Sequence, residues 1–171
     1  GADAKEPYRI LLNSDGGSGA LYAHEPPISD EQLCRVIDAL QGTQVDVFIQ
    51  SVSFGSFVAY GTKVGELYGK GRNEFEDPNF RRWAQNVLGL LEQGKDPLAI
   101  WAARAHSLGM EFWPSLRMND IHDSWTPQYV SQWKKNNPTM LMGKPEDYDR
   151  FPKSDPRSLW SFVDFAHQEV R

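Results

Sequence analysis

Hydrophobic residues along the chain alternate between runs of strand length and amphipathic runs of helix length. The run YRILLNSDGG predicts a short buried strand over residues 9–12 that ends in a polar, glycine-rich turn. In ISDEQLCRVIDALQGT, apolar residues recur at the helical period after Ser29, and the spacing from Ser29 to Gln32 is that of a capping box. The β-branched run VDVFIQSV predicts a second strand over residues 45–52.

The alternation resumes after a long connection that is rich in glycine and aromatic residues. Helical patterns cover residues 80–93 and 97–108, where Pro97 suits the first turn and Gly109 suits a helix stop. The run MEFWPSL over residues 110–116 has strand character again. The proline-rich segment that follows is predicted to be mostly loop, and the terminal DFAHQEVR looks like the first turn of another helix.

Strands that alternate with helices predict an α/β fold with a parallel sheet and right-handed crossovers. Both an open doubly wound sheet and a (β/α)8 TIM barrel fit this order. A nucleotide-binding loop is not indicated, because a long proline-containing segment separates the glycines of SDGGSG from the helix after Ser29. A barrel typically needs about 250 residues and eight strands. Either the fold is therefore not a barrel, or this chain is the front part of one, about three βα units long. We expect a single α/β domain over residues 1–171, with a disordered N-terminus over residues 1–7.

The composition excludes classes of function and says less about the fold. The net charge of −5 argues against nucleic acid as a partner, and no apolar run approaches the length of a membrane helix. The single cysteine, Cys34, allows no intrachain disulfide, and no motif indicates a cofactor. Aromatic residues make up 12% of the chain, with six tryptophans, and their flat faces suit sugar rings as well as core packing.

Three segments, YRILLNSDGG, FWPSLRMNDIHD and LWSFVDFAHQEVR, together resemble the glycosyl-hydrolase-like, family-10-like proteins of bacterial polysaccharide-degrading lineages. The resemblance covers nearly the whole chain in order and is sharpest in the run from Arg117 to Asp123 and in the terminal segment. It implies the N-terminal portion of a (β/α)8 glycoside hydrolase, with long βα loops after strands two and three and a secreted or periplasmic location. These proteins commonly have a proline after the cap of the last helix, where this chain has Gln168.

The same resemblance implies that the principal catalytic carboxylates lie beyond residue 171, because the superfamily has its acid/base after strand four and its nucleophile at strand seven. This chain would then supply substrate-binding residues at the rim. Its partners would be a carbohydrate and the missing half of the barrel, on the same or a second polypeptide, or another copy of the chain.

Side chains at the carboxyl ends of barrel strands line the active-site face, so polar residues after each predicted strand are the candidates for the site. Carboxylate, amide, guanidinium and imidazole groups bond sugar hydroxyls, and tryptophan faces stack on sugar rings. The expected substrate-binding residues are Asn13, Asp15, Gln50, Arg117, Asn119, Asp120, His122 and Trp125. The alternative is that Arg117 pairs with Asp120 or Asp123 and braces the loop without touching a ligand. The aromatic residues of the long loop after the second strand, Phe54, Phe57, Tyr60 and Tyr68, are expected either to wall a cleft, which we favour, or to form a small separate core.

Glycoside hydrolysis needs a pair of carboxyl groups, which Asp15, Asp120 and Asp123 could supply from adjacent strands, so Asp120 and Asp123 are also candidates for catalysis. A metal site formed by these two residues and His122 is conceivable, but no second histidine-rich motif accompanies them, so no metal is expected. Three functions stay open: a glycoside hydrolase acting on a poly- or oligosaccharide, a non-catalytic carbohydrate-binding barrel, and a free-standing α/β interaction domain.

Overall fold

The computed structural model describes residues 9–15 and 19–170, which form two compact units. Of these described residues, unit 1 takes in 9–15, 19–52, 59–61 and 69–115, and unit 2 takes in 53–58, 62–68 and 116–170. The expected disordered segment 1–7 lies outside the described residues. The expectation of a single domain over residues 1–171 stays a prediction, because two compact units can still belong to one folding domain.

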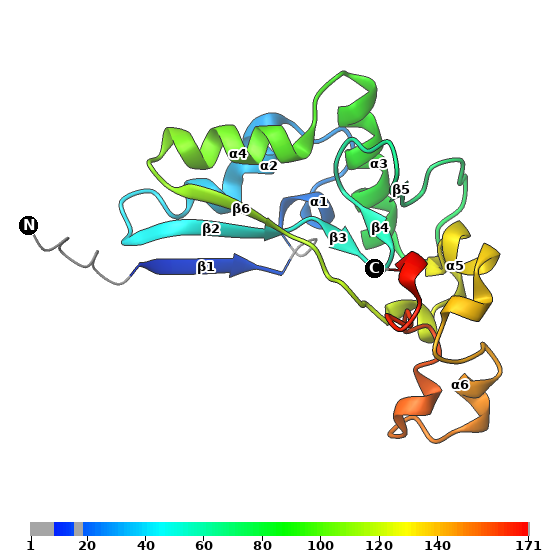
Figure 1. Ribbon diagram of the computed structural model, residues 1–171. Coiled ribbons are helices and arrows are strands. Elements are labelled where there is room, and N and C mark those ends of the chain that lie inside the picture. Colours follow the sequence, from blue (N-terminus) through cyan, green and yellow to red (C-terminus); the bar gives the residue numbers. More distant parts are fainter. Residues whose placement is uncertain (1–8, 16–18, 171) are drawn as a thin grey trace, which may run out of the picture. The chain divides into compact units, whose positions relative to one another are not determined.

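Unit 1 is built on a parallel sheet of three strands, β1 (Ile10–Ser14), β2 (Val45–Ser51) and β6 (Glu111–Ser115), in the order β1-β2-β6 (Figure 1). Asn13 is the register partner of Ile49, which in turn is the partner of Trp113. The spatial order of the strands is therefore their order in the chain, with helices in both connections. This confirms the predicted α/β class and the three predicted strands.

The helices of unit 1 are α1 (Ala20–Ala23), α2 (Asp30–Asp38), α3 (Pro78–Glu92) and α4 (Pro97–Ser107). Helix α2 begins with the predicted capping box, in which Ser29 and Gln32 each accept a hydrogen bond from the other's backbone N–H. Helix α4 begins with Pro97, as predicted, behind Asp96, whose side chain accepts the N–H of Leu98. Local sequence signals thus define the starts of these helices, because they satisfy N–H groups that a helix leaves unpaired.

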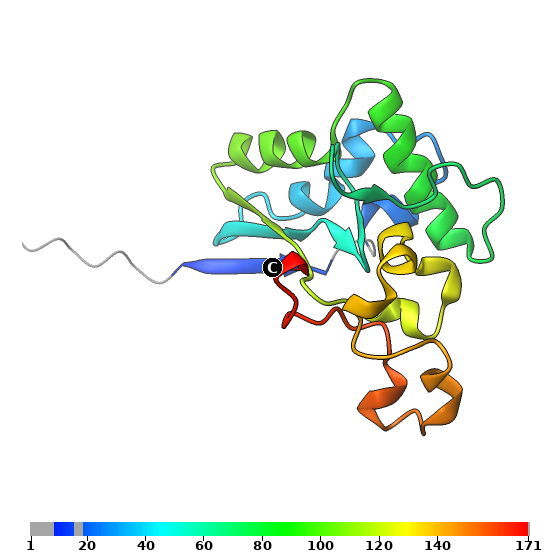
Figure 2. The ribbon, with the colours of Figure 1, turned by 45° about the vertical axis from the view of Figure 1, so that its right-hand side comes forward.

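One face of the sheet in unit 1 is covered by α2 and α4, which contact each other and lie on the same side of the strands in both views (Figures 1 and 2). Phe48 of β2 and Leu33 of α2 are fully buried in this layer. The indole Nε1 of Trp101 in α4 donates to the backbone oxygen of Leu33 at 3.2 Å, which ties the two helices together.

The other face of the same sheet carries a mixture of apolar and charged side chains. Leu11, Val47 and Glu111 are register partners and so point to one side, opposite to Phe48. Arg9 at the start of β1 pairs with Glu111 of β6 at 2.9 Å, and Val47 between these strands is fully buried. Leu11 keeps 47% of its surface exposed, so apolar surface remains uncovered on this face.

Unit 2 contains a small sheet and a series of short helical turns. Strand β3 (Ser53–Phe54) pairs antiparallel with β4 (Phe57–Val58), which pairs parallel with β5 (Glu66–Leu67). The region predicted to be mostly loop contains α5 (Gln132–Asn136), α6 (Asp147–Arg150) and 3-10 turns at His122–Ser124, Pro127–Tyr129, Pro138–Met140 and Pro156–Ser158. The terminal turn, Gln168–Val170, is a 3-10 helix. An antiparallel bridge between Leu141 and Val163 brings the last segment beside the segment after α5.

The aromatic residues of the long loop after the second strand form a small core in unit 2. The ring of Tyr68 makes edge-on contacts with Phe57 at 5.2 Å and with Tyr129 at 5.6 Å, and all three residues are buried. Phe54 contacts Tyr129 in the same manner. For Phe54, Phe57 and Tyr68 these ring contacts favour the alternative of a small separate core over the cleft wall. Tyr60 belongs to unit 1.

Candidate functional site

The candidates from the first two strands lie in unit 1. Asn13 and Asp15 are exposed at the end of β1. Gln50 is 3% exposed, and its Nε2 donates to the backbone oxygen of its neighbour Ser51 at 2.9 Å. Asn13 is in register with Ile49, so the side chain of Gln50 points to the opposite face of the sheet from Asn13. The sheet therefore does not bring the Asn13 and Gln50 side chains together.

The candidates after β6 lie in unit 2, and Asp120 stands at their centre. Its carboxylate is 1% exposed, and its Oδ2 accepts from Nη1 of Arg117 at 3.0 Å. Its Oδ1 accepts a hydrogen bond from the backbone N–H of His122 at 2.9 Å and also contacts Nδ1 of the His122 imidazole ring. Both oxygens are thus engaged within the loop, as the alternative of an Arg117–Asp120 brace predicts.

These contacts set the charge state of Asp120. Burial alone raises the pKa of a carboxyl group, but the hydrogen bonds from the backbone and ring of His122 and from Arg117 outweigh it. The pKa of Asp120 is lowered from 3.8 to about 2. A carboxyl group with so low a pKa holds no proton near neutral pH, and this does not suit a general acid.

Asn119 is held by the last segment of the chain. Its Oδ1 accepts the backbone N–H of Val163 at 2.9 Å, and its Nδ2 donates to the backbone oxygen of Val163 at 3.2 Å. This pair of hydrogen bonds imitates the pairing of two backbone strands. The amide of Asn119 therefore joins two segments that are distant in sequence, and this use competes with binding a sugar.

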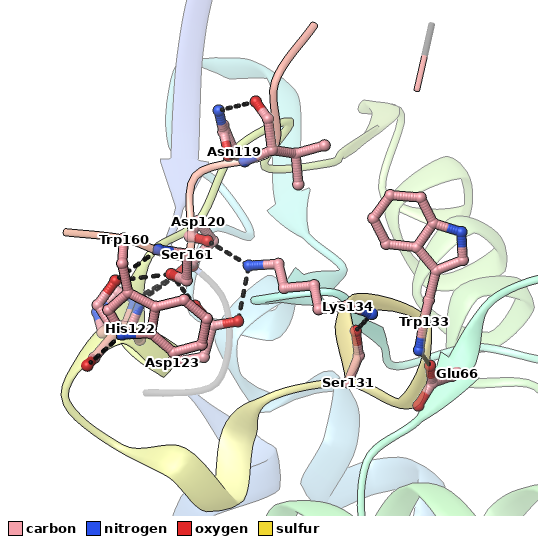
Figure 3. Close-up of polar contacts among 12 residues, drawn as sticks. Glu66, Asn119, Asp120, His122, Asp123, Ser131, Trp133, Lys134, Trp160 and Ser161 are labelled. Carbon is pink, nitrogen blue, oxygen red and sulfur yellow. Dashed lines mark hydrogen bonds and ion pairs between the residues drawn. The ribbon is translucent and has the colours of Figure 1, made fainter. Parts of the chain in front are cut away.

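Asp123 takes part in a second, fully buried ion pair. Its side chain is 0% exposed, and its Oδ2 lies 2.6 Å from Nζ of Lys134, whose side chain is 1% exposed (Figure 3). Its Oδ1 accepts from the hydroxyl of Ser161 at 2.5 Å. Because the Ser161 proton is used in this way, the hydroxyl of Ser124 must donate in its 2.7 Å contact with Ser161. Asp123, Lys134, Ser161 and Ser124 therefore form one connected network.

This network holds two tryptophans in place. Trp160 precedes Ser161, and its indole Nε1 donates to the backbone oxygen of Ser124 at 3.0 Å. Trp125 directly follows Ser124 in the chain. The link between Ser124 and Ser161 thus stabilises the backbone beneath both indoles.

Among the candidate residues after β6, the most accessible side chains are those of His122 and Trp125. The His122 side chain is 43% exposed, and Trp125 is 44% exposed. Their rings lie 5.3 Å apart in an edge-on arrangement. Because Nδ1 of His122 faces Asp120, Nε2 is the ring nitrogen left to form a hydrogen bond with a hydroxyl group. The side chain of Arg117, which is paired with Asp120, is 30% exposed.

Trp125 also forms part of the wall of a cleft of about 500 Å³ in unit 2. Trp160 and Tyr148 contribute to the same cleft, as do the charged residues Lys135, Lys144 and Asp149. Sequence reasoning missed all of these except Trp125, because they lie in the segment predicted to be mostly loop. The aromatic residues in that segment were the signal that could have marked it.

The cleft depends on a close backbone approach at Gly143. The N–H of Gly143 donates to the backbone oxygen of Trp160 at 3.1 Å, next to the bridge between Leu141 and Val163. A Cβ at Gly143 would lie 2.9 Å from the Cα of Trp160, closer than real side chains come. Glycine is therefore required for this wall of the cleft to form.

Among residues 9–15 and 19–170, no three histidine, cysteine, aspartate or glutamate side chains come together as a metal site would require. In the same part of the chain, no helix is both long enough and apolar enough to cross a bilayer. The chain matches no known protein-family model, and no curated protein sequence matches it.

Proposed function

We propose that the chain is the N-terminal, sugar-binding part of a (β/α)8 glycoside hydrolase that acts on a poly- or oligosaccharide outside the cytoplasm. The observation that carries the proposal is the cleft of about 500 Å³ in unit 2, with the half-exposed indole of Trp125 in its wall. Ligand clefts in proteins have volumes of about 300–1,000 Å³ and combine apolar walls with a few placed polar groups.

The chemistry of the cleft suits a sugar. A pyranose has apolar C–H faces and a rim of hydroxyl groups, so it binds where an aromatic face lies beside hydrogen-bonding side chains. Trp125, Tyr148 and Trp160 supply aromatic surface, and Lys135, Lys144 and Asp149 supply polar groups in the same cleft. His122 extends this arrangement through its ring contact with Trp125.

The proposal assigns the catalytic carboxylates to other parts of the protein, because those of Asp120 and Asp123 are inaccessible in unit 2. A nucleophile must reach the anomeric carbon, and a general acid must hold a proton. The two side chains are 1% and 0% exposed, and each is engaged by a cation. Their geometry favours the bracing of the loop over catalysis.

The barrel is supported by the sheet of unit 1, whose three parallel strands follow one another in sequence order as the strands of a barrel do. Among the described residues, β1 and β6 each pair on one side only, with β2. Ile10 and Trp113 on these edge strands are 46% and 45% exposed. Unpaired edges and exposed apolar groups are what further barrel strands would cover.

Light scattering on the 171-residue chain tests the barrel. Association with a further copy, or with a polypeptide that supplies the remaining strands, is the expected result. A monomer that unfolds cooperatively would count against an incomplete barrel.

A non-catalytic carbohydrate-binding barrel is the second candidate, and the inaccessible carboxylates of Asp120 and Asp123 favour it over an active site within this chain. Hydrolysis of a glycan panel by the protein that includes the whole barrel separates the two, because sugar binding without turnover identifies the binding protein.

The sugar-binding proposal is tested by titrating the chain with a glycan panel and comparing two tryptophan variants. Trp125→Ala removes one indole from the wall of the cleft, whereas Trp133→Ala removes a similarly exposed indole that is not part of that wall. Truncation of a central aromatic residue at a binding site costs about 2 kcal/mol or more, so W125A should weaken binding at least tenfold. Equal affinities for both variants, with native folding shown by circular dichroism, would refute the assignment of the cleft.

A further inference from the structure

Two of the lysines in the cleft wall form no ion pair within the part of the chain that the structure describes. Lys134 is paired with Asp123, but Lys135 and Lys144 have no ion pair among the described residues. Both lysines are exposed, and they come from different segments, Lys135 from α5 and Lys144 from the turn before α6. Their charges therefore meet at this cleft only because the chain folds as it does.

Among residues 9–15 and 19–170, the acidic groups nearby form no ion pair with either lysine. Asp149, which also lines the cleft, lies 3.6 Å from Nζ of Lys153. The Oδ2 of Asp147 accepts the backbone N–H of Lys144 at 2.9 Å, so this carboxylate is directed at the backbone of Lys144. Glu146 is exposed and is not among the residues that line the cleft. The wall thus combines aromatic surface with two exposed lysines that form no ion pair in the described part of the chain.

From this combination we infer that the cleft binds an anionic sugar residue, one with a carboxylate or a sulfate group, with Lys135 and Lys144 facing the anion and Trp125 stacking on the ring. The inference rests on the proposed function and adds the class of glycan. A neutral sugar would leave both ammonium groups without a partner, whereas an acidic sugar provides the opposite charge beside the stacking face. A uronic acid and a sulfated sugar share this chemistry.

The experiment is affinity electrophoresis and titration calorimetry of the 171-residue chain with matched charged and neutral polymers. Polygalacturonate is compared with its fully methyl-esterified form, and carrageenan with its desulfated form, so the members of each pair differ only at the anionic group. The variant K135Q/K144Q is compared with K63Q/K70Q, which removes the same charge from exposed lysines outside the cleft. Trp125→Ala is measured alongside.

The wild-type chain should bind at least one charged polymer more tightly than its neutral form, and added salt should weaken this binding. Since each exposed ion pair contributes modestly, K135Q/K144Q should lose about tenfold in affinity, and K63Q/K70Q should stay within about twofold of the wild type. W125A should also lose affinity. The charged member of whichever pair binds identifies the anion as carboxylate or sulfate.

Each contrary result has a distinct meaning. If neutral polymers bind as tightly as charged ones and W125A weakens both, the anionic preference is wrong and the sugar cleft stands. If charged polymers bind but K63Q/K70Q weakens them as much as K135Q/K144Q, or W125A has no effect, the attraction is diffuse and the inference is overturned. If no polymer binds, charged or neutral, the proposed sugar-binding function fails and the inference fails with it.

Discussion

The buried ion pair between Lys134 and Asp123 gives the most demanding test of how unit 2 is held together. Replacing Lys134 with methionine keeps the volume of the side chain and removes its charge. The Asp123 carboxylate would then be left 0% exposed, with the Ser161 hydroxyl as its remaining partner in the network. Water cannot reach the carboxylate to compensate, so the unpaired charge destabilises the folded state.

The size of the effect follows from this burial. Breaking a buried ion pair by removing one partner costs about 3–5 kcal/mol, whereas an exposed pair contributes about 0–1 kcal/mol. With 1% and 0% exposure and a separation of 2.6 Å between Nζ of Lys134 and Oδ2 of Asp123, the pair belongs to the first class. We expect Lys134→Met to lower the free energy of unfolding by about 3–5 kcal/mol, a large share of the total for a domain.

The assay is urea denaturation followed by tryptophan fluorescence. Lys135→Met is the matched control, because Lys135 is the next residue on the same helix and is exposed. It should change stability by less than about 0.5 kcal/mol. The double variant D123N/K134M should recover part of the loss, because it leaves no unpaired charge behind. If K134M and K135M unfold at the same urea concentration, the buried pair does not hold unit 2 together.

Three further predictions concern single sites. The pKa of Asp120 falls from 3.8 to about 2 on folding, so the ionised carboxylate contributes roughly 2 kcal/mol to the free energy of unfolding. This contribution is present above about pH 4 and is lost as the pH falls towards 2. The stability of D120N, measured by urea denaturation from pH 2 to pH 7, should therefore lack this acid-dependent loss; an unchanged profile would contradict it. Gly143→Ala should lower the melting temperature and weaken glycan binding, because its Cβ would meet the Trp160 backbone at 2.9 Å, at a cost of about 1–3 kcal/mol. Gly89→Ala, on α3 with nothing within 4 Å of the added Cβ, should raise the melting temperature, because alanine favours a helix over glycine by about 1 kcal/mol; a lower melting temperature would refute this.

The elements of unit 1 could be predicted because their signals are local. The apolar period that places α2 and the β-branched run that places β2 need no knowledge of distant residues, and the capping box at Ser29 needs only its neighbour Gln32. The face of the sheet to which a strand side chain points is harder to predict from the sequence. Gln50 was expected at the rim, but the side chains of a strand alternate between two faces, and its register partners place it opposite to Asn13.

Unit 2 could not be predicted in the same way, because its contacts join distant segments. The amide of Asn119 bonds Val163, which is 44 residues away. In QWKKNN, two adjacent lysines look equivalent, yet Lys134 is buried against Asp123 and Lys135 is exposed. A local pattern cannot show which lysine has a buried partner. The Arg117–Asp120 brace, by contrast, spans three residues and was foreseen as an alternative.

The central claim is that a sugar binds against Trp125, and the indole N–H signals of the chain test it most directly. The six tryptophans give six such signals in a nitrogen–proton correlation spectrum, and tryptophan variants assign them. On titration with a glycan that binds, we predict that the signal of Trp125 shifts most, that Trp160 in the same cleft also shifts, and that exposed Trp133 stays in place. A saturable shift at Trp133 or Trp113, with Trp125 unchanged, would contradict the claim.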